Sequence, residues 1–148
     1  MKIYLDTSVY NRPFDDQSQL RIQLESMAFL VIMKQIEEED YILVNSSVVF
    51  FENDKNPFSE RRKRIQSFLQ LAKVFVKLDK GIHSRSLELQ SLGFKAIDAL
   101  HLAAAEKSKA KYFLSCDDRV IKKAKKDLTK LNTTVLNPLE FLIVEVWR

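Results

Sequence analysis

Four acidic residues stand where apolar segments end or are interrupted, and they are the side chains in this sequence best placed to do chemistry. Asp6, Glu52 and Asp117 each come at, or soon after, the end of an apolar run, while Asp98 interrupts a segment rich in alanine and leucine. In open α/β sheets, ligands bind outside the carboxyl ends of the strands, where residues that are distant in sequence can meet. The pattern therefore predicts that these carboxylates share one site.

Carboxylates that share a crevice repel each other and raise each other's pKa unless a positive species binds between them. Hard divalent cations such as Mg²⁺ or Mn²⁺ are the usual partners of such oxygen ligands. Asp98 carries this argument furthest, because an unpaired charge in a mostly apolar helix is costly to bury. Either Asp98 pairs with Lys95 or a distant base, or it faces a cation, and we favour the cation.

The residues beside Asp6 and Asp117 can support these acids or cap helices. Asp6 is followed by Thr7-Ser8, so its carboxylate and these hydroxyls would lie at the same edge of the sheet, although an acid at a helix start is the simpler alternative. One residue near Asp117 must cap the helix that follows. We assign the cap to Asp118 or Ser115 and leave Asp117 to the site.

Three further polar residues near these acids have simpler interpretations. His101 lies three residues after Asp98, on nearly the same helical face, and we expect it to hydrogen-bond within the fold. Glu52 shares its helix with Asp54, and either could be only a surface charge. Cys116 is the one cysteine, so it has no internal disulfide partner and no zinc-type ligand set. A catalytic thiol needs a base and positive surroundings, which the neighbouring acid disfavours.

The elements that must position these residues are short apolar strands separated by helices. Only two glycines and three prolines are present, which argues against a turn-rich all-β fold. Strands are predicted at 2–6, 41–45, 74–78, 111–115 and 133–136. A turn capped by Thr7 or Ser8 and a loop at 11–16 are expected after the first strand. Helices are predicted at 18–39, after Ser46 or Ser47, and at 60–72, 82–92, 95–107 and 120–128. This alternation predicts an α/β fold with a parallel sheet and crossover helices.

Length and composition are typical of a soluble globular protein. A chain of 148 residues is most simply one domain, spanning 1–148. Its longest apolar run, 27–33, is far shorter than the roughly 20 residues that cross a bilayer. Lys2 is followed by only a brief apolar run before Asp6, which does not resemble a signal peptide. We therefore expect a cytoplasmic protein with no membrane partner.

Basic residues gather in two clusters in a chain whose formal net charge is +4. The first comprises Arg61, Arg62, Lys63 and Arg64, and the second Lys122, Lys123, Lys125 and Lys126. Either cluster could be only a solvated helix face. The first is the better candidate for contacts with a nucleic-acid backbone, because Phe58 and Phe68 flank it.

The helix predicted at 18–39 begins amphipathic and becomes apolar on nearly every side at 27–33. Such a segment needs two buried sides, and a domain of this size supplies one. A homodimer, or a small partner protein bound to this helix, is therefore expected.

Three segments resemble the successive motifs of one family. They look like the motifs of PIN-domain nucleases, the group that contains VapC-type toxins, and comprise IYLDTS at 3–8, KAIDALHLA at 95–103 and FLSCD at 113–117. The order and spacing of these segments agree with the family over essentially the whole chain. The resemblance implies a PIN-like three-layer fold, with a central parallel sheet flanked by helices. It also implies a divalent-metal site that hydrolyses RNA phosphodiester bonds, and a small antitoxin protein as partner.

Carried over by position, Asp6, Asp98 and Asp117 match the acids of the family, which would hold Mg²⁺ or Mn²⁺. Glu52 matches the family's helix glutamate and would act in catalysis with them, although the neighbouring pair Phe50-Phe51 departs from the usual small and aliphatic pattern. Ser115 stands where many members have threonine, and it would support the site together with Ser8.

Two competing functions remain beside the predicted metal-dependent endoribonuclease, the toxin of a toxin–antitoxin pair. A PIN-like module could bind RNA or a protein without cutting, although the presence of all four acids weighs against this. A haloacid-dehalogenase-like phosphatase would have a second aspartate two residues after the first, and Ser8 occupies that position. Single-stranded or looped RNA is the expected substrate, because side chains cannot read the deep groove of an A-form duplex.

Overall fold

The computed structural model describes residues 1–147; Arg148, the last residue of the predicted domain, lies outside the described part. The chain forms a five-stranded sheet in the order β3-β2-β1-β4-β5, in which all neighbours are parallel. The strands are β1 (Lys2–Leu5), β2 (Ile42–Ser46), β3 (Val74–Val76), β4 (Tyr112–Leu114) and β5 (Thr134–Leu136). The predicted α/β fold with a central parallel sheet is confirmed.

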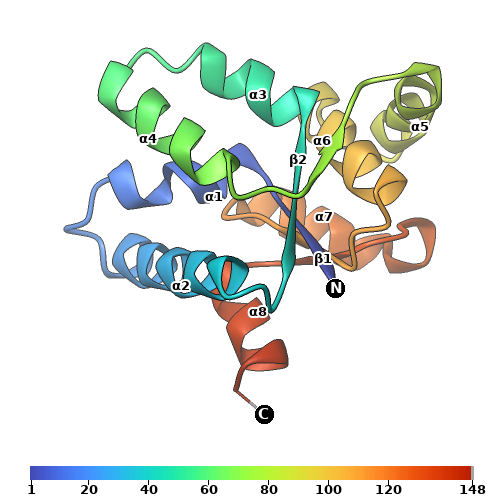
Figure 1. The fold of residues 1–148 in the computed structure, drawn as a ribbon. Coiled ribbons are helices and arrows are strands. Elements are labelled where there is room, and N and C mark those ends of the chain that lie inside the picture. Colours follow the sequence, from blue (N-terminus) through green and yellow to red (C-terminus); the bar gives the residue numbers. More distant parts are fainter. Residues whose placement is uncertain (148) are drawn as a thin grey trace.

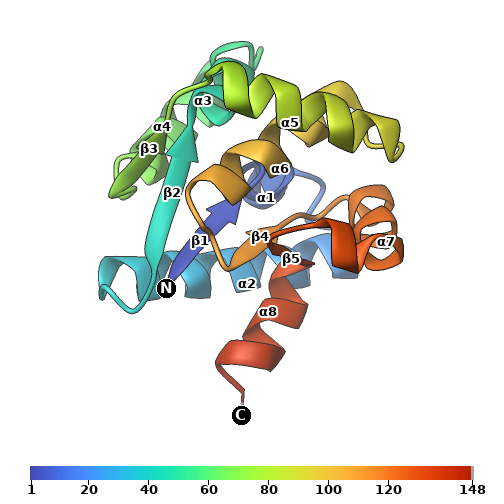
Figure 2. The same ribbon diagram turned by 90° about the vertical axis from the view of Figure 1, so that its right-hand side faces the viewer.

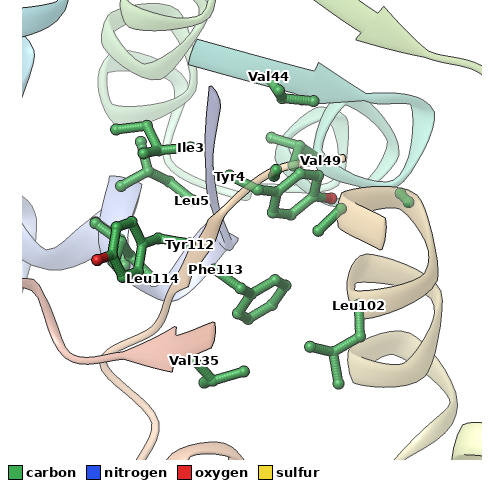
Figure 3. Close-up of a cluster of buried hydrophobic side chains, with 14 of the residues drawn as sticks. Ile3, Tyr4, Leu5, Val44, Val49, Leu102, Tyr112, Phe113, Leu114 and Val135 are labelled. Carbon is green, nitrogen blue, oxygen red and sulfur yellow. The ribbon is translucent and has the colours of Figure 1, made fainter. Parts of the chain in front are cut away.

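Strand β1 lies at the centre of the sheet, between β2 and β4. Its residues Ile3, Tyr4 and Leu5 are completely buried, as expected for a parallel strand that is covered on both faces. They form part of the buried cluster drawn in Figure 3. From β1 the chain builds outward through β2 to β3, and then returns to place β4 on the other side of β1. The order therefore reverses between β1 and β4, where a crevice for ligands is expected.

Helices cover both faces of this sheet. They are α1 (Thr7–Asn11), α2 (Leu20–Glu37), α3 (Ser47–Asp54), α4 (Ser59–Leu69), α5 (Lys80–Ser91), α6 (Ala96–Lys107), α7 (Asp118–Lys126) and α8 (Pro138–Glu145), with short 3₁₀ helices η1 (Arg12–Phe14) and η2 (Leu128–Lys130). Helices α2 and α8 lie on one side of the sheet, and α5 and α6 on the other (Figures 1 and 2). The predicted three-layer arrangement is confirmed.

Three local features differ from the sequence-based expectation. The turn after β1 is the short helix α1, and its cap is Asp6, not Thr7 or Ser8, because the Asp6 carboxylate accepts the backbone N–H groups at the helix start. Part of the predicted loop 11–16 is the 3₁₀ helix η1. Helix α8 was not predicted, although Asn137 and Glu140 form a capping box around Pro138, a recognisable start signal.

A buried carboxylate in α2 joins three elements. Glu25 is completely buried; it accepts a hydrogen bond of 2.8 Å from the Arg12 guanidinium of η1, and another from the amide of Asn137, the cap of α8. The neighbouring Ser26 hydroxyl donates to the Arg12 carbonyl at 3.0 Å. A buried charge is tolerated only when it is paired and hydrogen-bonded in this way. Glu25 therefore fixes both η1 and α8 against α2.

The middle of α2 is apolar all round, but the described residues bury only one side of it. Ala28 and Ile32 are in the core, whereas Met27, Leu30 and Val31 are 59%, 55% and 44% exposed. Even so, within residues 1–147 no helix combines the length and apolar character needed to cross a membrane.

Replacing Glu25 with alanine is expected to lower the free energy of unfolding by about 1.5–3 kcal/mol, because Arg12 and Asn137 lose a charged hydrogen-bond acceptor. Urea unfolding measures this change. Glu37→Ala, at an exposed position of the same helix, is the matched control and should change the free energy by no more than about 0.5 kcal/mol. Equal losses in the two variants would show that the buried network does not stabilise the fold.

Candidate active site

The four predicted acids come from four different elements and interact in the folded chain. Asp6 and Asp117 cap the helices α1 and α7, while Glu52 lies in α3 and Asp98 in the first turn of α6. Burial raises the pKa of the Asp98 carboxyl above its ordinary value of 3.8; the negative charges of the other three acids raise it further, and His101 opposes them. The structure thus brings Asp6, Glu52 and Asp117 within electrostatic reach of Asp98.

Asp6 is the most buried of the four and is held by its neighbours. Its carboxylate accepts hydrogen bonds from the backbone N–H and the hydroxyl of Ser8. The Ser8 hydroxyl oxygen also accepts the Cys116 backbone N–H at 2.9 Å and lies 3.5 Å from the Ser115 hydroxyl. Burial raises the pKa of Asp6, while His101 and the serine hydroxyls lower it, with a net increase. Ser8 and Ser115 therefore join the carboxyl ends of β1 and β4 beside this acid.

Glu52 ends a chain of hydrogen bonds that runs through the core. Its Oε1 accepts the Thr7 hydroxyl at 2.8 Å and contacts Nε2 of the buried His101. The other ring nitrogen, Nδ1, lies 2.6 Å from the Tyr4 hydroxyl, which lies 2.7 Å from the Ser46 hydroxyl. The predicted hydrogen-bonding of His101 within the fold is confirmed.

These contacts are all satisfied when His101 carries its proton at Nε2. The imidazole then donates to Glu52 and accepts from Tyr4, whose own oxygen accepts from Ser46. Burial favours a higher pKa for Glu52, but His101 and the Thr7 hydroxyl outweigh it and lower the pKa below its ordinary value. Glu52 therefore stays ionised, in a fixed orientation, at neutral pH.

The assignment of the cap of α7 is a correction. The Asp117 carboxylate accepts the Arg119 backbone N–H at 2.9 Å and pairs with the Arg119 guanidinium at 3.3 Å, so Asp117 is the cap. Asp118 binds Arg21 instead, and the Ser115 hydroxyl accepts the Asp117 N–H at 3.0 Å. Burial raises the pKa of Asp117, but its contacts with Arg119 lower it overall. Asp117 therefore acts on the charge of Asp98 while it is bound to its own helix.

As these side chains are placed, no three ligand-type groups within residues 1–147 lie close enough to hold one metal ion together. The reason is local, because three of the acids turn toward donors of the chain: Asp6 toward Ser8, Glu52 toward His101 and Asp117 toward Arg119. The oxygen donors nevertheless match the preference of Mg²⁺ or Mn²⁺.

The four basic residues 61–64 do not act as one free patch. Arg61 donates to the Phe14 carbonyl at 2.7 Å, and Arg62 donates to the Asn56 carbonyl at 2.8 Å, so their guanidinium groups also tie down loops. Lys63 and Arg64 are exposed. Arg61 lines a hollow of about 310 Å³ together with Thr7 and Glu52, next to the acids.

A second, smaller hollow of about 150 Å³ also borders the acids. Its walls include Asp98 and three basic residues, Lys95, Arg119 and Lys123. Lys123 comes from the second basic cluster of the sequence, whereas Arg119 was not predicted as a site residue. The position of Arg119, two residues after Asp117 and at the start of a helix, is the signal that could have identified this residue.

A family model described as PIN domain matches residues 3–126 of the chain. The chain belongs to the PIN domain family. Among solved structures it is similar to a chain in the crystal structure of VapBC2 from Rickettsia felis bound to a DNA fragment from their promoter, with 16% sequence identity and a TM-score of 0.52. The match covers 93% of this chain and 98% of the other. A search of curated proteins found no match.

The four acids of this PIN domain were predicted as site residues from the sequence, but Tyr4 and Thr7, which hold Glu52 directly or through His101, were not. Tyr4 stands inside an apolar strand and Thr7 in the turn after it, so in the sequence they resemble core and capping residues. Their hydroxyl groups connect, directly or through His101, to the one carboxylate that lies on α3. Tyr4, Thr7 and His101 are therefore part of the candidate site.

Replacing Asp98 with asparagine is expected to leave the melting temperature of the metal-free protein at neutral pH unchanged or higher. The raised pKa means that the folded state binds a proton more tightly than the unfolded state, so ionised Asp98 lowers stability above its folded pKa. The advantage of the variant should disappear as the pH falls below the ordinary value of 3.8. Thermal melts across this pH range measure it, and a variant that melts well below the parent at neutral pH would refute the account.

Proposed function

We propose that this PIN domain is a divalent-metal-dependent endoribonuclease that hydrolyses RNA phosphodiester bonds. One observation carries the proposal: Asp98 is only partly buried, faces three other acids, and makes no hydrogen bond or ion pair with the described residues. A carboxylate in such surroundings favours the binding of an external cation. PIN domains are generally nucleases, which agrees with this chemistry.

Asp6, Asp98 and Asp117 are the residues that would hold Mg²⁺ or Mn²⁺. When bound, such a cation lowers the pKa of water and neutralises charge on the scissile phosphate. Glu52 would orient the attacking water, because its lowered pKa keeps the carboxylate ionised and His101 and Thr7 occupy only its Oε1. Its Oε2 accepts no hydrogen bond from residues 1–147 and remains free to accept one from that water.

The substrate that fits this site is single-stranded or looped RNA. Side chains cannot reach base edges in the deep major groove of an A-form duplex, whereas unpaired nucleotides can be spread over an open surface. The net charge of +4 favours association with such a polyanion. Both hollows beside the acids contain basic residues, among them Arg61 and Arg119.

We further propose that the protein is the cytoplasmic toxin of a toxin–antitoxin pair. The similarity in fold to a chain of VapBC2, which was crystallised with promoter DNA, motivates a small antitoxin protein as partner. The exposed apolar residues of α2 offer a surface for that partner or for a second copy. Leu24, Met27 and Val31 recur every three to four residues and so lie along one face of the helix.

Asp98→Asn is expected to abolish cleavage of a labelled single-stranded RNA in the presence of Mn²⁺, because it removes one carboxylate ligand at nearly constant volume. The rise in melting temperature on adding Mn²⁺ should shrink in the same variant, since stabilisation by a ligand follows its affinity for the folded state. Asp54→Asn is the matched control on the helix of Glu52; it is exposed and should cleave like the parent.

Cleavage by Asp98→Asn at the parental rate would exclude Asp98 as a metal ligand. A parent that binds RNA but does not cut it with Mg²⁺ or Mn²⁺ would instead support the non-cleaving module considered from the sequence.

Met27→Glu is expected to disrupt the assembly of the chain, because it places a charge in the middle of the exposed apolar face of α2. Light scattering should show a dimer, or a complex with a small partner, for the parent and a smaller species for the variant. Ser67→Glu, which puts the same charge on an exposed position of α4, is the control. A parent that remains a monomer at high concentration and recovers no partner in a pull-down would contradict the expectation.

A further inference from the structure

The hollow of about 310 Å³ beside the acids is bounded by α1, α3 and the start of α4. Its walls include Thr7, Glu52, Lys55, Asn56, Phe58 and Arg61. Two of these residues belong to the candidate site, because the Thr7 hydroxyl donates to Glu52 at 2.8 Å. The hollow is therefore continuous with the place where a scissile phosphate would lie.

Phe58 is an exposed aromatic ring that the chain holds in place. It is 60% exposed, although a ring of this size is normally drawn into a core. Its backbone N–H donates to the Asn56 side chain at 3.2 Å, and its carbonyl accepts the N–H of Arg62 at 2.9 Å. The Arg61 guanidinium lies 4.9 Å from the ring centroid.

Arg61 is itself fixed, because it donates to the Phe14 carbonyl at 2.7 Å. It thereby covers one face of the Phe58 ring, and the exposure of the ring shows that solvent reaches the remainder. A rigid aromatic face of this kind is what proteins use to stack an unpaired nucleobase, and a neighbouring arginine adds attraction to the nucleic acid.

Polar groups around the ring suit the rest of a nucleotide. The Lys55 ammonium lies 4.1 Å from the centroid of the Phe51 ring and lines the same hollow, where it can approach a backbone phosphate. The Asn56 amide donates to the Asn11 side chain at 3.2 Å with one of its two N–H groups, which leaves the other for a base edge.

The smaller hollow, at Asp98, differs in chemistry from the hollow at Phe58. It contains three cations, and its aromatic residue, Phe94, is buried. Lys123 packs directly over Gly93, so closely that a Cβ at that position would collide with its ammonium group. That hollow can attract a phosphate but presents no exposed ring. One hollow beside the acids therefore presents an exposed ring, and the other does not.

We propose that the hollow at Phe58 is a nucleobase subsite: an unpaired base of the RNA stacks on Phe58 while the strand crosses the acids toward Lys95, Arg119 and Lys123. The inference rests on the proposed function and deepens it, because it names the part of the substrate that each flank of the site receives. The subsite selects unpaired RNA, since a base within a duplex cannot reach the ring.

The test is a binding measurement without divalent metal, so that no cleavage takes place. The probe is a short single-stranded RNA that carries 2-aminopurine, whose fluorescence is quenched when the base stacks on an aromatic ring. Phe58→Ala is expected to weaken binding by about 5- to 150-fold and to remove the quench. The log–log salt slope should not change, because no phosphate contact is lost. Phe58→Trp should restore both binding and quench.

Two control variants separate stacking from charge and from general effects on the surface. Phe75→Ala removes a ring with a similar exposure of 53%, which lines a different hollow without charged residues, and it should bind RNA like the parent. Lys123→Ala should keep the quench but reduce the salt slope by about 0.7, the value for one phosphate contact on a single strand.

Phe58→Ala binding as tightly as the parent, with the quench intact, would overturn the subsite. This outcome is distinct from failure of the proposed function. If the proposed function fails, the parent protein would bind the RNA and quench its fluorescence, yet leave it uncut when Mn²⁺ is added. The subsite would then stand as part of a binding module.

Discussion

Repulsion among four carboxylates is the constraint around which the neighbouring residues are arranged. Three of the acids are each balanced by donors from the chain: a serine hydroxyl for Asp6, an imidazole and a hydroxyl for Glu52, and a guanidinium for Asp117. Asp98 lacks such a partner among the described residues, and burial, together with the charges of the other acids, raises its pKa. The sheet makes this crowding possible, because its strand order reverses between β1 and β4 and brings the ends of separate segments together.

Much of the fold could be predicted because its strands are short apolar runs with polar residues on either side. The run before Asp6 is a clear case, since three completely buried residues are followed at once by a charge. The start of α8 was also encoded locally, in the order Asn137, Pro138 and Glu140, and was overlooked. The cap of α7 could not be decided in this way. Asp117 and Asp118 are adjacent acids, and what separates them is Arg21, which reaches Asp118 from a distant helix.

The candidate site was predictable in its acids but not in what holds them. Each acid interrupts or ends an apolar segment, which local sequence reveals, whereas hydrogen-bond partners depend on the packing of distant elements. Tyr4 resembles any buried strand residue until its hydroxyl is seen beside His101. Likewise Arg61 resembles one member of a basic run, yet its contact with the Phe14 carbonyl separates it from Lys63 and Arg64.

The hydrogen-bonded chain from Ser46 through Tyr4 and His101 to Glu52 has a consequence for how this sequence can evolve. Each member is satisfied by the next, and the links join four elements through the core. A change of Tyr4 to phenylalanine would leave a buried imidazole nitrogen without its donor, so a compensating change at His101 would be favoured. These positions should therefore covary among descendants of this chain. A substitution at one of them should be accepted only where its hydrogen-bond partner has already changed.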